Sequence, residues 1–180
     1  MSTTMIPSDE ATRDQLHLAK QQGEALGKAL QEMIQNEAHG EEKRVGDYLV
    51  GYAVEHAEGM YRMQAGELEW YEPQEENAHI EISVRDAEDG RFIPGLTVRL
   101  TVLNENEEEI DTNEQPFIWH PWLYHYGRNW VLPNDGNYIF HVFIEAPQFM
   151  RHDKKNGKRY SDPVHVEFKN VKIETGQKHS

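Results

Sequence analysis

Histidines and acidic residues are the side chains best suited to chemistry in this sequence, which contains no cysteine. His79 and Glu81 stand two residues apart in the segment HIEISVRD. If that segment is a strand, its period of two places both side chains on one face, opposite Ile80 and Ile82. An imidazole beside a carboxylate forms half of a site for a borderline metal ion. The alternative interpretation is an exposed strand face with no ligand.

The most unusual stretch is FIWHPWLYHYGRNW, residues 117–130, which surrounds His120 and His125 with aromatic residues. Pro121 and Gly127 predict a shaped loop here rather than a long strand. Aromatic walls exclude water and lower the local dielectric, which strengthens metal coordination. Two alternatives remain open: an aromatic core whose histidines bond to the backbone, and an aromatic platform for a carbohydrate.

A third candidate ligand, His152, follows Met150 in a polar loop. Imidazole and thioether can both bind copper, and thioether favours Cu(I). The alternative is a solvated basic loop. Met60 and Met63 are further soft donors by type, although we expect them to be packing residues.

Composition excludes several classes of function. Without cysteine there are no disulfides, thiolate metal sites or cysteine nucleophiles. No G-x-S-x-G, P-loop, Gly-rich dinucleotide loop or H-E-x-x-H motif occurs, so we do not expect an enzyme. A formal net charge of −14 argues against binding to nucleic acid and would attract cations. No apolar run is long enough to span a membrane.

One helix is predicted over residues 8–38. Ser8 and Asp9 can cap it, apolar residues recur at alternating spacings of three and four, and Gly40 is a plausible stop. We expect this helix to dock on its own domain or on a partner copy, because a seam of this length does not make a stable free coiled coil.

Beyond Gly40 the pattern changes to alternation with a period of two. Strands are predicted at 47–56, 67–72, 79–86, 96–104, 137–146 and 164–173. Short strands separated by turns predict an all-β fold, an antiparallel β-sandwich with an N-terminal α-helical extension. The expected division is a helical extension at 1–45, the sandwich at 46–175 and a disordered tail at 176–180.

The ordered motifs resemble a known family. The His-x-Glu strand opening, PGLTVRLTVLN, HYGRNW, GNYIFHVFIEAP and RHD, spread over residues 46–173, are similar to the periplasmic ferrous-iron-transport accessory proteins of bacteria. These are copper-binding, immunoglobulin-like proteins, usually dimeric, that support high-affinity uptake beside an iron permease. The HYG and GNY…EAP pieces are the most specific.

The resemblance implies a set of metal ligands. The strand-opening pair matches His79 and Glu81, the histidine before Tyr-Gly matches His125, and the late histidine matches His152. The family's methionine ligand falls at His120 when the phenylalanines are aligned. An imidazole in place of a thioether shifts the preference from Cu(I) towards Cu(II), iron or zinc.

The function implied is therefore capture of a copper or iron ion, with zinc a further candidate, by a homodimer that serves an iron permease. Neutral imidazole is needed for binding, so affinity should fall below about pH 6. The resemblance implies the periplasm, but residues 1–15 lack the features of a signal peptide, which predicts a cytosolic protein or one whose signal has been replaced. The alternatives are a module binding a sugar or peptide through residues 117–130, and an assembly protein using the helix.

Overall fold

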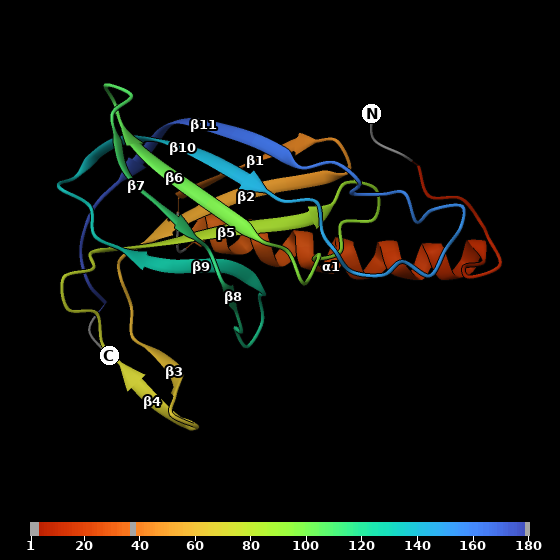
Figure 1. The fold of residues 1–180 in the computed structure, drawn as a ribbon, viewed down its shortest axis with the longest axis horizontal. Coiled ribbons are helices and arrows are strands. Elements are labelled where there is room, and N and C mark those ends of the chain that lie inside the picture. The colour runs from red at the N-terminus through yellow and green to blue at the C-terminus, as the bar shows by residue number, and fades with distance from the viewer. Residues whose placement is uncertain (1–3, 37–38, 179–180) are drawn as a thin grey trace.

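Alternating apolar and polar residues form two antiparallel sheets in the computed structural model, which describes residues 4–36 and 39–178 (Figure 1). The five-stranded sheet has the order β1 (His39–Val45), β2 (Tyr48–Glu55), β5 (Ala78–Asp86), β9 (His125–Trp130) and β8 (Phe117–Ile118). The four-stranded sheet has the order β11 (Val164–Ile173), β10 (Gly136–Ile144), β6 (Val98–Asn104) and β7 (Glu109–Glu114). The predicted all-β sandwich with an N-terminal helix is confirmed.

The main core lies between the two sheets. On β5, Ile80, Ile82 and Val84 alternate with polar residues and are fully buried. They belong to one cluster with Leu100 of β6 and Phe140 of β10. Removing this apolar surface from water holds the two sheets together, and it fixes the register that turns the other face of β5 outwards.

The outer face of β5 is buried as well. His79, Glu81 and Ser83 alternate with the core residues, yet the whole strand is inaccessible. Over Glu81 and Ser83 the cover comes from α1 (Arg13–Asn36), which runs along this side of the sheet (Figure 1). Leu30 and Met33 of α1 pack against the sheet, and polar strand residues thus lie in an enclosed layer.

The helix begins later than the capping pattern at Ser8 predicts. Thr12 and Gln15 form a reciprocal capping box, in which each side chain accepts from the other's backbone N–H. Ser8 instead closes a turn by accepting from the N–H of Ala11 and donates to Asp153 at 2.7 Å. The predicted end of the helix, at residue 38, lies outside the described residues.

The helix docks on its own domain, which is one of the two arrangements expected. Leu30 and Met33 pack against Ala53 of β2 and Leu123 of the β8–β9 loop. Close approach depends on Gly23, where an added Cβ would lie 1.7 Å from the backbone oxygen of Asp89.

The aromatic stretch 117–130 is partly strand, which corrects the loop predicted there. Phe117–Ile118 and His125–Trp130 pair as β8 and β9 around an irregular segment. Gly127 lies inside β9, where a Cβ would approach the carbonyl oxygen of Ile80 and the His125 ring at 3.1 Å. Its small size therefore serves strand packing rather than a turn.

Strands β1, β7 and β3 (Met60–Gln64) carry polar, weakly alternating sequences and were not predicted. The predicted strand at 67–72 is β4 (Glu67–Tyr71), which pairs only with β3 in a hairpin projecting from the sandwich (Figure 1). None of the described helical residues forms a segment long and apolar enough to cross a membrane.

Candidate metal centre

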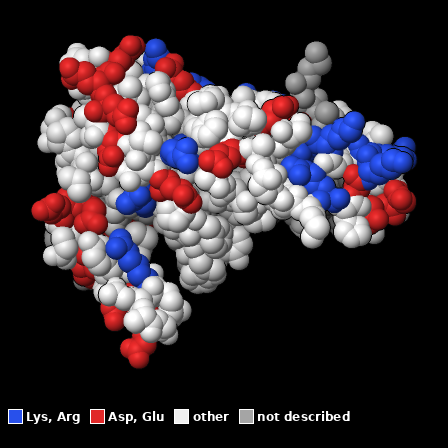
Figure 2. Space-filling view, viewed as in Figure 1, with Lys and Arg blue, Asp and Glu red and all other residues white. Residues whose placement is uncertain are grey.

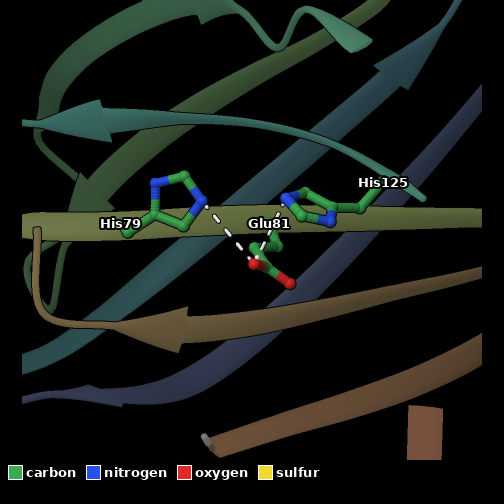
Figure 3. A group of neighbouring side chains, drawn as sticks. All are labelled: His79, Glu81 and His125. Carbon is green, nitrogen blue, oxygen red and sulfur yellow. Dashed lines mark ion pairs between the residues drawn. The ribbon is translucent and has the colours of Figure 1, made fainter. Parts of the chain in front are cut away.

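Three side chains that can bind a metal ion converge on the outer face of the five-stranded sheet: His79, Glu81 and His125 (Figure 3). β5 supplies the first two and β9, its neighbour, supplies the third. Glu81 lies opposite Gly127, and the period of two puts His125 on the same face as Gly127. Oε1 of Glu81 is 3.6 Å from Nε2 of His79 and 3.2 Å from Nε2 of His125.

Asn129 fixes the His79 ring. Its Nδ2 donates to the carbonyl oxygen of Glu58 at 2.7 Å, and its Oδ1 accepts from the backbone N–H of Glu58 at 3.3 Å. These bonds identify the amide oxygen, so Nδ1 of His79, 2.9 Å away, must carry the proton and donate it. Nε2 of His79 therefore presents a lone pair to Glu81.

A backbone carbonyl gives His125 the same tautomer. Its Nδ1 lies 3.3 Å from the carbonyl oxygen of Leu123, which can only accept a hydrogen bond. The proton is therefore on Nδ1, and Nε2 carries the lone pair. Metal-binding histidines are commonly held in this way, with the nitrogen that does not bind the metal acting as donor.

Burial keeps both imidazoles neutral. Desolvation lowers the pKa of His125 to about 3, assisted by the nearby His79 imidazole. It lowers the pKa of His79 as well, against the opposing pull of the Glu58 carboxylate. Both Nε2 atoms are buried and have no hydrogen-bond partner within the described residues.

Two lone pairs facing a carboxylate oxygen form an arrangement that could hold a cation. A buried polar atom without a partner costs about 1–3 kcal/mol, and a cation between the three ligand atoms would satisfy both nitrogens. Two imidazoles and one carboxylate suit a first-row transition metal. The residues present therefore fit copper, iron or zinc.

A second carboxylate cluster, Glu55, Glu58 and Glu81, adjoins the His79 side of this group. Oε1 of Glu58 is 3.8 Å from Nε2 of His79. The ammonium of Lys178 pairs with Glu55 and lies 3.2 Å from Oε2 of Glu58. Burial acts to lower the pKa of Lys178, but these carboxylates outweigh it and raise the pKa. Lys178 thus offsets part of the charge of the acidic cluster and occupies two of its carboxylates, so the histidine group is the better candidate for a metal site.

His120 lies beside the group, on the loop between β8 and β9. Its ring centroid is 6.1 Å from that of His125, and Trp122 packs edge-on against it. Nδ1 of His120 is buried without a hydrogen-bond partner in the part of the chain described. The structure brings His120 near the ligands but not within the compact group of three.

His152 is far from the other candidates. Its side chain is 96% exposed, and its Nδ1 lies 3.4 Å from Oε2 of Glu10, just before α1. The candidate metal ligands lie near the other end of α1, because Leu30 lines a cavity with Glu81. At 1.5 Å per residue, α1 extends about 25 Å between Arg13 and Leu30. His152 therefore cannot join the site of its own chain in this arrangement.

A groove of about 990 Å³ leads from solvent to the ligands. The β3–β4 hairpin forms one wall with Tyr61 and Trp70, and β8 with its following loop forms the other with Phe117 and Trp119. These four side chains are about half exposed or more. His125 lies where the groove reaches the site.

Sequence reasoning missed Asn129 and Glu58. Asn129 follows His125 by four residues on β9, so alternation would have indicated it if residues 125–130 had been predicted as a strand. Glu58 lies in an irregular segment after β2, and no local pattern marks it.

Comparisons of the sequence and of the fold with known proteins identify a family and several similar solved structures. The sequence profile of a family described as Fe2+ transport protein matches residues 35–174. Among curated proteins there is no match.

Solved structures provide the remaining comparisons. FetP of uropathogenic Escherichia coli strain F11 matches with a TM-score of 0.62 at 20% identity, covering 77% of this chain and 95% of that one. Copper-reconstituted P19 of Campylobacter jejuni matches with a TM-score of 0.63 at 18% identity, covering 78% and 98%. A copper-bound variant of FetP gives 0.58 at 20% identity, covering 76% and 97%. At these identities the likeness establishes a shared fold.

Proposed function

This chain belongs to the Fe2+ transport protein family, and from that premise we propose that it captures a copper or iron ion in support of high-affinity iron transport. The observation that carries the proposal is the convergence of two neutral imidazole lone pairs on one buried carboxylate. His79 and His125 bind the ion, Glu81 balances its charge, and Asn129 holds the first imidazole in the binding tautomer. Copper is supported by the copper-bound relatives, and iron by the family.

Capture needs no covalent step. The acidic surface raises the local concentration of cations, and the groove beside His125 takes them to the site. His120 would add a third imidazole, which favours Cu(II), iron or zinc over Cu(I). The receiving partner in this proposal is a membrane iron permease, which the family's role in transport supports.

The proposed assembly is a homodimer in which His152 of one copy completes the site of the other. Two features support this: His152 is exposed on a loop remote from its own site, and basic side chains cluster around that loop (Figure 2). Basic side chains gather over the loop between β10 and β11, and acidic ones over the far end of the sandwich and the hairpin (Figure 2). The basic loop is thus electrostatically complementary to the acidic end of a second copy.

The central test substitutes each imidazole. His79→Ala and His125→Ala should lose Cu(II) binding in equilibrium dialysis, with bound metal counted by elemental analysis. His165→Ala, an exposed histidine on β11, is the matched control and should bind as the unmodified protein does. If His79→Ala and His125→Ala both bind Cu(II) as the unmodified protein does, this assignment of the metal site is wrong.

The dimer is tested separately by sedimentation equilibrium with and without Cu(II). His152→Ala should weaken metal binding at protein concentrations where the dimer forms. A chain that stays monomeric when metal-loaded, with full affinity, would exclude a role for His152 while leaving the other ligands in place.

A second candidate function is supported by the groove. Its exposed aromatic walls, Tyr61, Trp70, Phe117 and Trp119, also suit stacking against a sugar or an apolar peptide side chain. That function predicts a protein purified without metal. It further predicts that Trp119→Ala abolishes binding to an oligosaccharide array, whereas His79→Ala does not.

A further inference from the structure

A small cavity lies between α1 and the five-stranded sheet, lined by residues of both. Its volume is about 20 Å³, and Met33 of α1 lines it together with Glu81 and His125. A void needs roughly 10–15 Å³ to hold one water molecule, so this one accommodates a single water or ion. The cavity thus joins two metal-ligand candidates to a thioether from a different element.

The position of Met33 is set by its packing. Met33 is 5% exposed and belongs to one buried apolar cluster with Ala53 and Leu123. Ala53 is the register partner of Glu81 on the neighbouring strand, and Leu123 precedes His125 by two residues. Adjacent strands lie about 4.8 Å apart, so this cluster lies close to both ligands, and Met33 lines one cavity with them.

Other methionines are placed less favourably. Met63 and Met150 are 67% and 100% exposed, on the hairpin and on the β10–β11 loop. Met60 lines the groove with His125 and is the one rival close to the site. Within residues 4–36 and 39–178, Met33 is the methionine that belongs to the buried core.

Thioether chemistry suits this place. Methionine is unbranched, with a flexible side chain that can move its sulfur without moving the backbone. Thioether sulfur is a soft ligand that favours Cu(I), whereas the imidazoles and the carboxylate serve harder ions as well. A sulfur next to His125 and Glu81 would let one site hold copper in its reduced state.

We propose that Met33 supplies a thioether ligand to the metal centre, so that α1 contributes directly to binding Cu(I). The inference rests on the proposed function, since it adds a ligand to the same site. It goes further because the family match begins at residue 35, so Met33 and almost all of the helix that carries it lie before the match. The helix is then part of the metal centre and not only a cover.

The experiment is X-ray absorption at the copper edge on the full chain loaded with Cu(I). The unmodified protein and Met60→Leu should show a sulfur shell, and Met33→Leu should show nitrogen and oxygen scattering alone. Leucine conserves volume, so the docked helix should remain folded. In competition with a colorimetric chelator, Met33→Leu should lose at least about tenfold in Cu(I) affinity, the smaller end of losses seen when a metal site is disturbed. Its Zn(II) affinity should be unchanged.

Each contrary result has a distinct meaning. A sulfur shell that survives in Met33→Leu but disappears in Met60→Leu assigns the thioether to the groove side and overturns the inference. Unmodified protein that binds Cu(I) with nitrogen and oxygen alone also overturns it, and leaves the proposed function standing. If the protein binds neither copper nor iron, both the inference about Met33 and the proposed function are wrong.

Discussion

At the scale of single residues, tautomers decide what the metal centre can bind. Asn129 and the Leu123 carbonyl each accept a hydrogen bond from the Nδ1–H of an imidazole, so both Nε2 lone pairs face Glu81. Reversed tautomers would place two N–H groups there and favour an anion. In the proposed metal centre, hydrogen bonds made on the far side of each ring would therefore select for cations.

The buried imidazoles also predict how the metal-free protein responds to acid. The pKa of His125 is about 3 in the folded state, while an unfolded histidine titrates near about 6.5. Between these values the unfolded chain binds more protons, so stability falls as the pH falls from about 6.5 towards 3. Urea unfolding of His125→Gln should show a shallower loss over this range, by a few kcal/mol at most. The exposed His165→Gln should follow the unmodified curve, and identical curves for all three proteins would contradict the burial argument.

The same depression of the pKa refines the expected pH dependence of binding. A histidine with an ordinary pKa would release metal below about pH 6. Because His79 and His125 resist protonation, binding should persist to more acidic pH than the sequence predicts.

Part of this candidate site could be predicted from the spacing of residues in the sequence. The pair His79 and Glu81 shares a face because strand alternation is a local property, and the structure has that arrangement. Asn129 was missed because Gly127 was interpreted as a turn residue, which hid the alternation of β9. The position of His152 depends on how the β10–β11 loop folds back on the N-terminal segment, and no local pattern encodes that.

At the scale of elements, α1 determines the environment of the site. Without a cover, the polar face of β5 would be solvated, as is usual for one side of an antiparallel sheet. With α1 in place, Glu81 and Ser83 are buried, and the imidazole pKa of His125 is depressed by the same desolvation. The heptad seam predicted a docked helix, but it could not identify the face that the helix covers.

Two helix glycines provide a matched test of this docking. Gly23→Ala would place Cβ 1.7 Å from the Asp89 carbonyl oxygen, whereas Gly27→Ala would meet only the guanidinium end of Arg85, at 3.2 Å. Alanine gains about 1 kcal/mol in helix propensity, so Gly27→Ala should be neutral or stabilising in thermal unfolding. Gly23→Ala should be destabilising by about 1–3 kcal/mol, the usual cost of overpacking. Equal stabilisation by both would show that α1 does not pack closely on this loop.

At the scale of the whole molecule, charge and shape act together on the approach of the ion. The formal charge is −14, and the open groove ends at His125. The ligands themselves are buried, so an ion reaches them only after it has entered the groove. The negative field would therefore influence the rate of capture more than the strength of the final complex.

Ionic strength separates these two effects. The Debye length falls from about 10 Å at 0.1 M salt to about 3 Å at 1 M, so added salt should slow the association of Cu(II) and leave its dissociation unchanged. Stopped-flow quenching of tryptophan fluorescence can measure both rates, because Trp70 and Trp119 line the groove. Glu76→Gln, in the groove wall, should reduce the salt dependence, whereas Glu174→Gln, an acidic residue that is not part of that wall, should have less effect. If the association rate does not change with ionic strength, the groove walls, and not the acidic surface, govern how the ion reaches the site.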